Sequence, residues 1–225
     1  MRGMSETLRS KAYLIKQKIK KKLRSMRPHY RTVDEYWLQK IPYTNIGDRL
    51  DLFREECKAK DVLHFGCTDW PVFNPKNNLH ITLSEITKSI DGFDIDKPGI
   101  EALRSYVGQE YYSDFESLSS KKYDVCLIPE TIEHVDNVGS FLSNLSKVNA
   151  SKFLITAPNC FSQARQQNYR VEKDTFIEIV HPDHNAWYSP YTLKNVIEKY
   201  SELEVTKVYL MQNKTMVCCE AIKKK

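Results

Sequence analysis

The stretch D-V-L-H-F-G-C-T-D-W, residues 61–70, contains the first strand-like run of the pattern that predicts the fold. A short strand-like run, 62–65, ends there at Gly66, and such runs alternate with helix-like runs through the rest of the chain. This alternation predicts a mostly parallel sheet with helices on both faces. A glycine at the end of the first strand lets the backbone approach a ligand closely, because it carries no Cβ.

Seven strands are expected in this sheet. Their runs lie at residues 62–65, 89–94, 110–112, 124–128, 152–157, 204–211 and 215–222. Only three residues separate the last two runs, too few for a crossover between parallel strands, so these two form an antiparallel hairpin that ends the sheet. Helices are expected at residues 49–59, 100–106, 138–147 and 189–200. The fold class is therefore α/β: a Rossmann-like, seven-stranded, mostly parallel sheet with a C-terminal antiparallel hairpin.

The composition predicts a globular protein of a reducing compartment. No apolar run approaches the roughly 20 residues that a helix needs to cross a bilayer. The six cysteines form no C-x-x-C pair, and several lie in strand-like runs, where a thiol behaves as a small buried hydrophobic group. We therefore expect neither zinc nor disulfides, and a cytoplasmic location.

The basic charge is concentrated at the amino terminus. Residues 1–27 hold ten Lys or Arg against Glu6 alone, a net charge of +9, whereas the remainder has 24 basic and 28 acidic residues, a net charge of −4. Apolar residues recur there in steps of three and four, which predicts a basic amphipathic helix. We expect a helix or arm over residues 1–30 and one catalytic domain over residues 31–225.

Three roles remain open for this basic helix. Residues 8–27 could lie on an anionic membrane surface, which would place the protein peripherally on the inner membrane face. The segment could instead pack on the domain, or fold only on a partner. Nucleic acid is the weakest of the three, because no aromatic residues are interleaved with the charges. Lysines interrupt any candidate signal-peptide core, so a secretory signal is not expected.

Candidate site residues follow the predicted strands, where ligands bind in a doubly wound sheet. Asp94 lies 28 residues beyond Gly66 and could accept hydrogen bonds from two ribose hydroxyls. Asp96, before Lys97 and a proline, fits a helix cap better. Asp114 follows the third strand and could accept from an adenine amino group.

Taken in order, these blocks resemble the class I S-adenosylmethionine-dependent methyltransferases, in particular the small-molecule O-methyltransferase-like branch. D-V-L-H-F-G-C is similar to the first motif of the family, G-F-D-I-D to the second, S-D-F-E-S-L to the third, and K-Y-D-V-C-L-I-P-E-T-I-E-H-V-D-N to the fourth. F-L-I-T-A-P-N and H-P-D-H-N-A-W-Y-S-P-Y-T-L continue the resemblance, which extends over residues 60–222.

The resemblance implies S-adenosyl-L-methionine as the cofactor. Gly66 would abut its methionine part, Asp94 the ribose, and Asp114 with Phe115 the adenine, while Pro129 and Glu130 would border the methyl-transfer site. The implied cofactor-binding set is His64, Gly66, Cys67, Asp94, Ile95, Asp114, Phe115, Pro129 and Glu130.

The sequence departs from the family at three positions. His64 stands where the family usually has an acid, and Thr68 and Trp70 stand where it usually has two further glycines. The glycine-rich loop is thus incomplete, which leaves open a domain that keeps the fold and has lost catalysis. H-F-G-C-T-D-W-P is also similar to methyltransferases encoded with glycan assembly enzymes, which implies a role in polysaccharide biosynthesis.

The expected reaction is O-methylation of a sugar, a glycan intermediate or another small hydroxylated metabolite. A hydroxyl acceptor requires a base, and the candidates are His134, His181 and His184, because imidazole titrates near neutral pH. Each of these histidines could equally serve a structural role. No metal site is expected, since the H-x-x-H of residues 181–184 lies in a loop and no third ligand is indicated.

Two other classes of function remain as alternatives. An NAD-dependent oxidoreductase would also need an acid after the second strand, but the absence of G-x-G-x-x-G and the terminal hairpin count against it. The other alternative is a catalytically degenerate binding or scaffolding module that acts through its basic arm. The oligomeric state does not follow from the sequence.

Overall fold

The computed structural model describes residues 37–69, 73–118, 120–162 and 169–224. The chain divides into two compact units, residues 1–40 and 41–225, and all the elements below belong to the second. The basic helix expected over residues 1–30, and the domain boundary that follows it, lie outside the described residues and stay predictions. Among the described residues no helix is long and apolar enough to span a bilayer.

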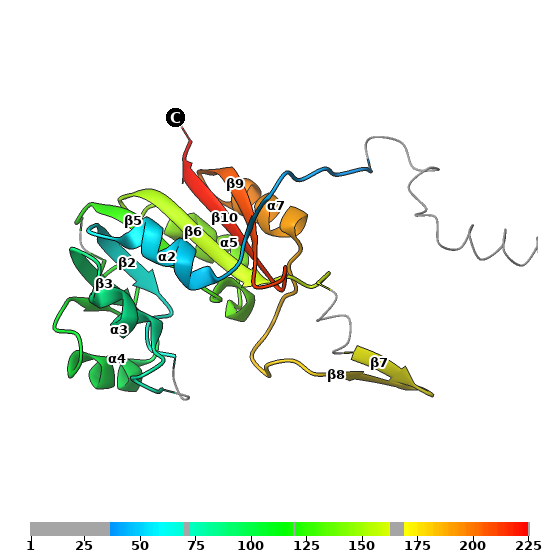
Figure 1. Ribbon diagram of the computed structural model, residues 1–225, viewed down its shortest axis with the longest axis horizontal. Helices are drawn as coiled ribbons and strands as arrows, with labels where there is room; N and C mark the ends of the chain where they lie inside the picture. Colours follow the sequence, from blue (N-terminus) through cyan, green and yellow to red (C-terminus); the bar gives the residue numbers. More distant parts are fainter. Residues whose placement is uncertain (1–36, 70–72, 119, 163–168, 225) are drawn as a thin grey trace, which may run out of the picture. The chain divides into compact units, whose positions relative to one another are not determined.

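An eight-stranded sheet forms the centre of the second unit (Figure 1). Its strand order is β1-β9-β10-β6-β5-β2-β3-β4. The strands are β1 (Thr44–Ile46), β2 (Asp61–Phe65), β3 (Ser89–Phe93), β4 (Tyr111–Tyr112), β5 (Tyr123–Ile128), β6 (Ala150–Pro158), β9 (Leu203–Met211) and β10 (Met216–Lys223). All neighbouring pairs are parallel except those of β10, which runs antiparallel to both β6 and β9.

The seven predicted strands are all present, and the β9–β10 hairpin is confirmed. Two expectations about the sheet are wrong. The antiparallel strand does not end the sheet, because β10 is inserted between β6 and β9. The count is eight rather than seven, because the three-residue strand β1 pairs with β9 at the far edge. A separate hairpin of β7 (Tyr169–Glu172) and β8 (Thr175–Glu178) was also not expected.

Helices cover both faces of the sheet, as predicted (Figure 1). They are α2 (Arg49–Cys57), α3 (Leu79–Ser84), α4 (Lys97–Arg104), α5 (Val138–Leu145) and α7 (Pro190–Tyr200), with a 3-10 helix η2 (Ile132–His134). The apolar residues of α2 and α3 join one core cluster, and those of α5 and α7 join another on the opposite face. Among these α-helices, α3 is the one that the sequence pattern did not predict.

Strand β5 shows how the two faces arise from the sequence. Val125 and Leu127 belong to the cluster with α2 and α3, whereas Cys126 and Ile128 belong to the cluster with α5 and α7. Successive side chains of a strand point to opposite faces, so a continuous apolar run is buried on both. All six cysteines are free thiols, and Cys160 is the one that is not buried.

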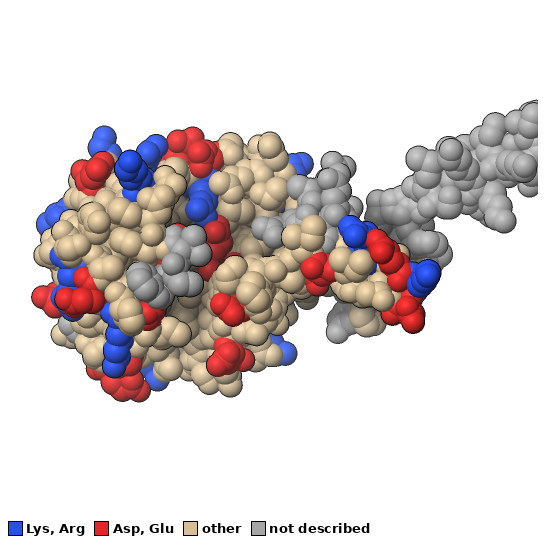
Figure 2. Space-filling model, turned by 90° about the horizontal axis from the view of Figure 1, so that it is seen from below, with Lys and Arg blue, Asp and Glu red and all other residues tan. Residues whose placement is uncertain are grey.

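Charges are mixed over the face of the domain that Figure 2 shows. On the face in Figure 2, Lys and Arg lie among Asp and Glu, without a broad area of one sign. A nucleic acid duplex needs a basic patch or stripe to neutralise its phosphates. This face of the domain does not offer one.

Candidate functional site

The parallel strands β2, β3, β4, β5 and β6 have their carboxyl ends at one edge of the sheet. Hydrogen bonds join the residues after β2 and β3 to the neighbouring strands there. The N–H of Gly66, after β2, donates to the carbonyl of Phe93 at 2.9 Å, and the N–H of Asp94, after β3, donates to the carbonyl of Tyr112 at 3.0 Å. The predicted site positions of neighbouring strands therefore share one edge, where ligands bind in open α/β sheets.

Gly66 occupies a position that favours glycine. Its φ is +67°, in the left-handed region, and it is exposed. A Cβ placed on it would lie 2.7 Å from Oγ1 of Thr131, in the loop that follows β5. That hydroxyl donates to the carbonyl of Pro129 at 3.0 Å. The turn after β2 is thus packed directly against the loop after β5.

Asp94 holds the turn after β2 in place. Its Oδ2 accepts from the N–H of Thr68 at 3.1 Å and from the Thr68 hydroxyl at 2.9 Å, and its Oδ1 accepts from the N–H of Asp96 at 3.0 Å. Each carboxylate oxygen offers about two lone pairs, so Oδ2 is saturated and Oδ1 keeps one position. A ribose would use that position or displace the Thr68 hydroxyl.

At the position of Thr68, the family that the sequence resembles usually has a glycine. The Thr68 side chain points into the protein interior. It is buried, and a Cβ on Gly99 of α4 would come within 2.6 Å of the Thr68 Cβ. Gly99 also donates its N–H to Asp96, which caps α4 as its sequence position predicts. A glycine at this position would leave the turn after β2 flexible, whereas Thr68 packs this turn against α4.

The predicted adenine contacts, Asp114 and Phe115, are exposed and half-buried, respectively. Asp114 caps a turn, since its Oδ1 accepts from the N–H of Ser117 at 2.6 Å. Phe115 is half-buried and packs on Phe93, with ring centroids 5.0 Å apart. Ile95 is 82% exposed, an apolar side chain next to Asp94 that a ligand could cover.

His64 and Cys67 have buried side chains. His64 is 1% exposed, and its Nδ1 lies 3.2 Å from Nδ1 of His80. Burial, together with the neighbouring His80, holds the pKa of His64 well below its ordinary value, so the ring is neutral. Burial raises the pKa of the Cys67 thiol. A contact from either residue to a ligand at the sheet edge would come from the backbone rather than the side chain.

Glu130 and Asp69 are acidic residues with an unfavourable backbone conformation. Both are non-glycine residues with positive φ, +46° and +55°, a conformation that persists where the surroundings impose it. The N–H of Glu130 donates to the Thr156 hydroxyl at 3.0 Å, and its carboxylate forms an ion pair with Arg49 of α2. Burial and the nearby Glu130 raise the pKa of Asp69.

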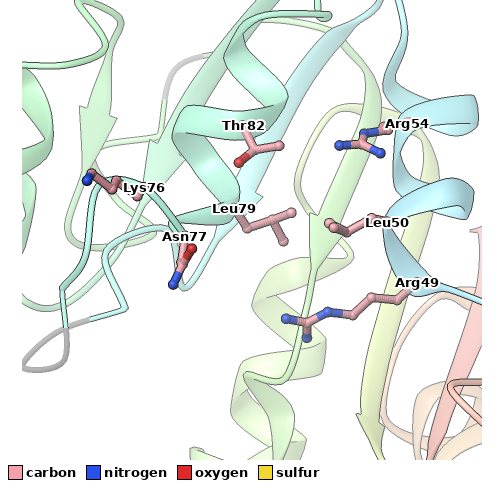
Figure 3. Close-up of a pocket in the computed structure, with 7 residues that line it drawn as sticks. All are labelled: Arg49, Leu50, Arg54, Lys76, Asn77, Leu79 and Thr82. Atoms are coloured by element: carbon pink, nitrogen blue, oxygen red, sulfur yellow. The ribbon is translucent and has the colours of Figure 1, made fainter.

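A basic hollow of about 390 Å³ lies beside Arg49 (Figure 3). It is lined by Arg49, Leu50, Arg54, Lys76, Asn77, Leu79 and Thr82. Arg49 and Arg54 extend from α2 on one side, and Lys76 lies across from them before α3. The sequence pattern gave no sign of this hollow, because its cations come from separate segments and have no diagnostic spacing.

The three candidate bases lie together. His134 ends η2, whereas His181 and His184 lie in the loop before α7, yet one nitrogen of each lies within 4.8 Å of the others. The ring centroid of His134 is 4.6 Å from that of His184 and 5.3 Å from that of His181. Burial, and then His181, lowers the pKa of His134, so its neutral form is favoured.

Asn185 joins the loop before α7 to the 3-10 helix. Its N–H donates to the carbonyl of Glu133 at 2.7 Å, and its Nδ2 donates to the carbonyl of His134 at 3.0 Å. Farther along, the carbonyl of Tyr188 accepts from the N–H of Cys160 at 2.9 Å. The histidine cluster is therefore held by one backbone and one side-chain hydrogen bond from Asn185, between segments about 50 residues apart in sequence.

No protein-family model matches the sequence, and no curated protein has a matching sequence. Solved structures are similar in fold. An S-adenosylmethionine-dependent methyltransferase from Aquifex aeolicus superposes with a TM-score of 0.56 at 15% identity, over 79% of this chain and 90% of that one. A putative type 11 methyltransferase from Sulfolobus solfataricus gives a TM-score of 0.54 at 10% identity, with the same coverage of 79% and 90%.

A third similar structure carries a ligand. Magnesium protoporphyrin IX methyltransferase from Synechocystis PCC 6803, with bound S-adenosylhomocysteine, gives a TM-score of 0.51 at 12% identity, over 77% of this chain and 78% of that one. Identities this low show the fold alone. With the strand order and the inserted antiparallel strand described above, the chain has the Rossmann-like fold of the class I S-adenosylmethionine-dependent methyltransferases.

Proposed function

We propose that the protein is an S-adenosylmethionine-dependent methyltransferase that O-methylates a sugar, a glycan intermediate or another small hydroxylated metabolite. The observation that carries the proposal is the meeting of Gly66, Asp94 and Thr131 at the carboxyl edge of a sheet with this fold. In open α/β sheets that edge is where nucleoside cofactors bind.

The cofactor is proposed to lie over Gly66 with its ribose toward Asp94. Asp114 and Phe115 would contact the adenine, and Ile95 would cover one face of the ring. Pro129 and Glu130 would border the sulfonium. The side chains of His64 and Cys67 would support this binding from the core, through the backbone that they fix.

The acceptor is proposed to enter between the histidine cluster and the basic hollow. Methyl transfer is an in-line displacement, in which the acceptor oxygen forms a bond to the methyl carbon while the S–C electron pair stays on sulfur. The hydroxyl proton would pass to one of the clustered histidines. Arg54 and Lys76 suit a phosphate or carboxylate elsewhere on the acceptor, since no ion pair holds either within the described residues.

Calorimetric titration with S-adenosylhomocysteine and, separately, with NAD tests the cofactor. We expect one S-adenosylhomocysteine per chain and no NAD. Incubation with methyl-labelled S-adenosylmethionine and a panel of phosphorylated and neutral sugars, read by mass spectrometry, then tests the reaction. Binding of NAD in preference to S-adenosylhomocysteine would exclude the proposal.

One observation favours a second function, a binding module that has lost catalysis. The Thr68 hydroxyl occupies a lone pair of Asp94 that a ribose would otherwise use. In this alternative the basic segment, residues 8–27, docks the protein on an anionic membrane surface at the cytoplasmic face. Binding of S-adenosylhomocysteine without methylation of any acceptor, together with liposome association, would favour it.

A further inference from the structure

The histidine cluster has the donor set of a metal centre. His134, His181 and His184 each offer one imidazole nitrogen, and these nitrogens lie within 4.8 Å of one another. Three imidazoles suit zinc and other divalent transition metals, whereas magnesium and calcium prefer oxygen ligands. We propose that these three histidines bind one divalent transition-metal ion, zinc or a metal of similar ligand preference.

The geometry needs only a small contraction. Zinc binds imidazole nitrogen at about 2.0–2.1 Å, so tetrahedral ligands lie about 3.4 Å apart. The observed separations of up to 4.8 Å exceed this by about 1.4 Å. The His181 side chain is 51% exposed, so rotation about its side-chain bonds can bring its nitrogen closer to the other two without moving the core.

The surroundings fix the other two ligands. Asn185 binds the carbonyls of Glu133 and His134, and thereby holds the loop that carries His184 against the end of η2. Metal-binding histidines are usually oriented by such outer contacts. Asp183 adds a carboxylate 3.9 Å from Nδ1 of His181. Its N–H donates to the same nitrogen at 3.3 Å, a long bond that His181 would give up if it bound through Nδ1.

The three-ligand set leaves a fourth coordination position for water or another oxygen. One consequence rests on the proposed function: an acceptor hydroxyl in that position would have a lowered pKa and would lose its proton to solvent before its oxygen takes the methyl group. A ring nitrogen bound to metal has no lone pair left to accept that proton. A given nitrogen of the cluster can therefore bind the metal or act as the base, but not both.

The test uses the full chain without a polyhistidine tag, stripped with a chelator and dialysed. Zn²⁺ is titrated by calorimetry, and Co²⁺ by its visible absorption, which reports coordination geometry. We expect one ion per chain and a tetrahedral Co²⁺ spectrum without thiolate bands. His181→Gln and His134→Gln should each weaken Zn²⁺ binding at least tenfold. Because His181 is exposed, its variant keeps the fold, which circular dichroism checks.

Two matched controls exclude other ligands. His29→Gln removes a histidine outside the described residues, and Cys160→Ser removes the one cysteine that is not buried; neither should change Zn²⁺ affinity. Loss of affinity in a control, or affinity within threefold of the unmodified chain in both cluster variants, would overturn the site. S-adenosylhomocysteine titration of the same proteins is a separate readout: zinc binding without cofactor binding would refute the proposed function and leave the metal site standing.

Discussion

Asp94 and Thr68 bind each other through two hydrogen bonds, from the Thr68 N–H at 3.1 Å and the Thr68 hydroxyl at 2.9 Å to one carboxylate oxygen. The acid after β3 thus positions the turn after β2 before any ligand arrives. This preorganisation lowers the entropy that a ligand loses in ordering the loop, while it occupies acceptor sites that the ligand would use.

Asp94→Ala is expected to weaken S-adenosylhomocysteine binding by about 1.5–3 kcal/mol, the range for hydrogen bonds to a charged group. It also releases the turn after β2. Calorimetry measures the affinity. The matched control is Asp96→Ala, which removes the cap of α4 and should reduce stability by about 1 kcal/mol with little change in affinity. Unchanged affinity in Asp94→Ala would refute the ribose assignment.

Thr68→Val is expected to strengthen S-adenosylhomocysteine binding two- to tenfold. The variant keeps the shape of the buried side chain and removes the hydroxyl that competes with the ribose for Oδ2 of Asp94. Thr68→Ser, which keeps the hydroxyl, should bind as the unmodified chain does. Weaker binding in Thr68→Val would mean that the hydroxyl supports the site rather than competing for it.

Gly66→Ala is expected to destabilise the fold by about 1–3 kcal/mol, because it forces alanine to a φ of +67° and its Cβ to 2.7 Å from the Thr131 hydroxyl. Adding Thr131→Ala should recover the steric part and leave the backbone strain. Urea denaturation of the two single variants and the double variant separates these terms. Additive effects would show that the two residues are not in contact.

Stability is expected to fall as the pH drops from 7 toward 4. Burial lowers the pKa of His80 to about 4, from an ordinary value of 6.5, so the unfolded chain takes up a proton that the folded chain refuses. The contribution of neutral His80 is therefore complete above pH 6.5 and decreases by about 3 kcal/mol by pH 4.

Denaturation of the unmodified chain and of His80→Gln at pH 7 and at pH 4.5 measures this contribution. The difference in unfolding free energy between the two pH values should be about 2–3 kcal/mol smaller in the variant. The neighbouring His64, whose pKa is lowered in the same direction, keeps part of the dependence in both proteins. Equal pH dependence would show that folding does not lower the pKa of His80.

Deletion of residues 1–27 is expected to leave S-adenosylhomocysteine binding unchanged and to reduce association with anionic liposomes, because the segment carries a net charge of +9. Liposome sedimentation at low and high salt measures the association, with neutral liposomes as the control. Loss of cofactor binding on deletion would instead make the segment part of the catalytic domain.

Local patterns predicted the strand ends well. Gly66 and Asp94 could be placed because each directly follows an apolar run, and parallel strands bring such positions to one edge. Asp96 could be identified as the cap of α4 from the lysine and proline that follow it. The side-chain direction of Thr68 could not, since it depends on the space that Gly99 leaves in another element.

Long-range pairing was not predictable in the same way. The three residues of β1 carry no periodic signal of their own, and they form a strand only because the edge of β9 is available. The short turn before β10 predicted that β10 pairs with β9. It did not predict that the other side of β10 pairs with β6. His134 was predicted as a candidate base, but its place beside the H-x-x-H loop was not predictable for a similar reason, because Asn185 joins that loop to the carbonyl of His134.

The insertion of β10 affects how the chain folds during synthesis. Pro158 pairs with Met216 and Ala157 with Val217, so one side of β6 waits for residues made 58 positions later before its N–H and C=O groups find partners. Until then a nascent chain carries an open edge of six residues, 153–158, that can pair with another polypeptide. Release from the ribosome before Met216 emerges should therefore yield aggregates, and stalled chains should need a chaperone at β6.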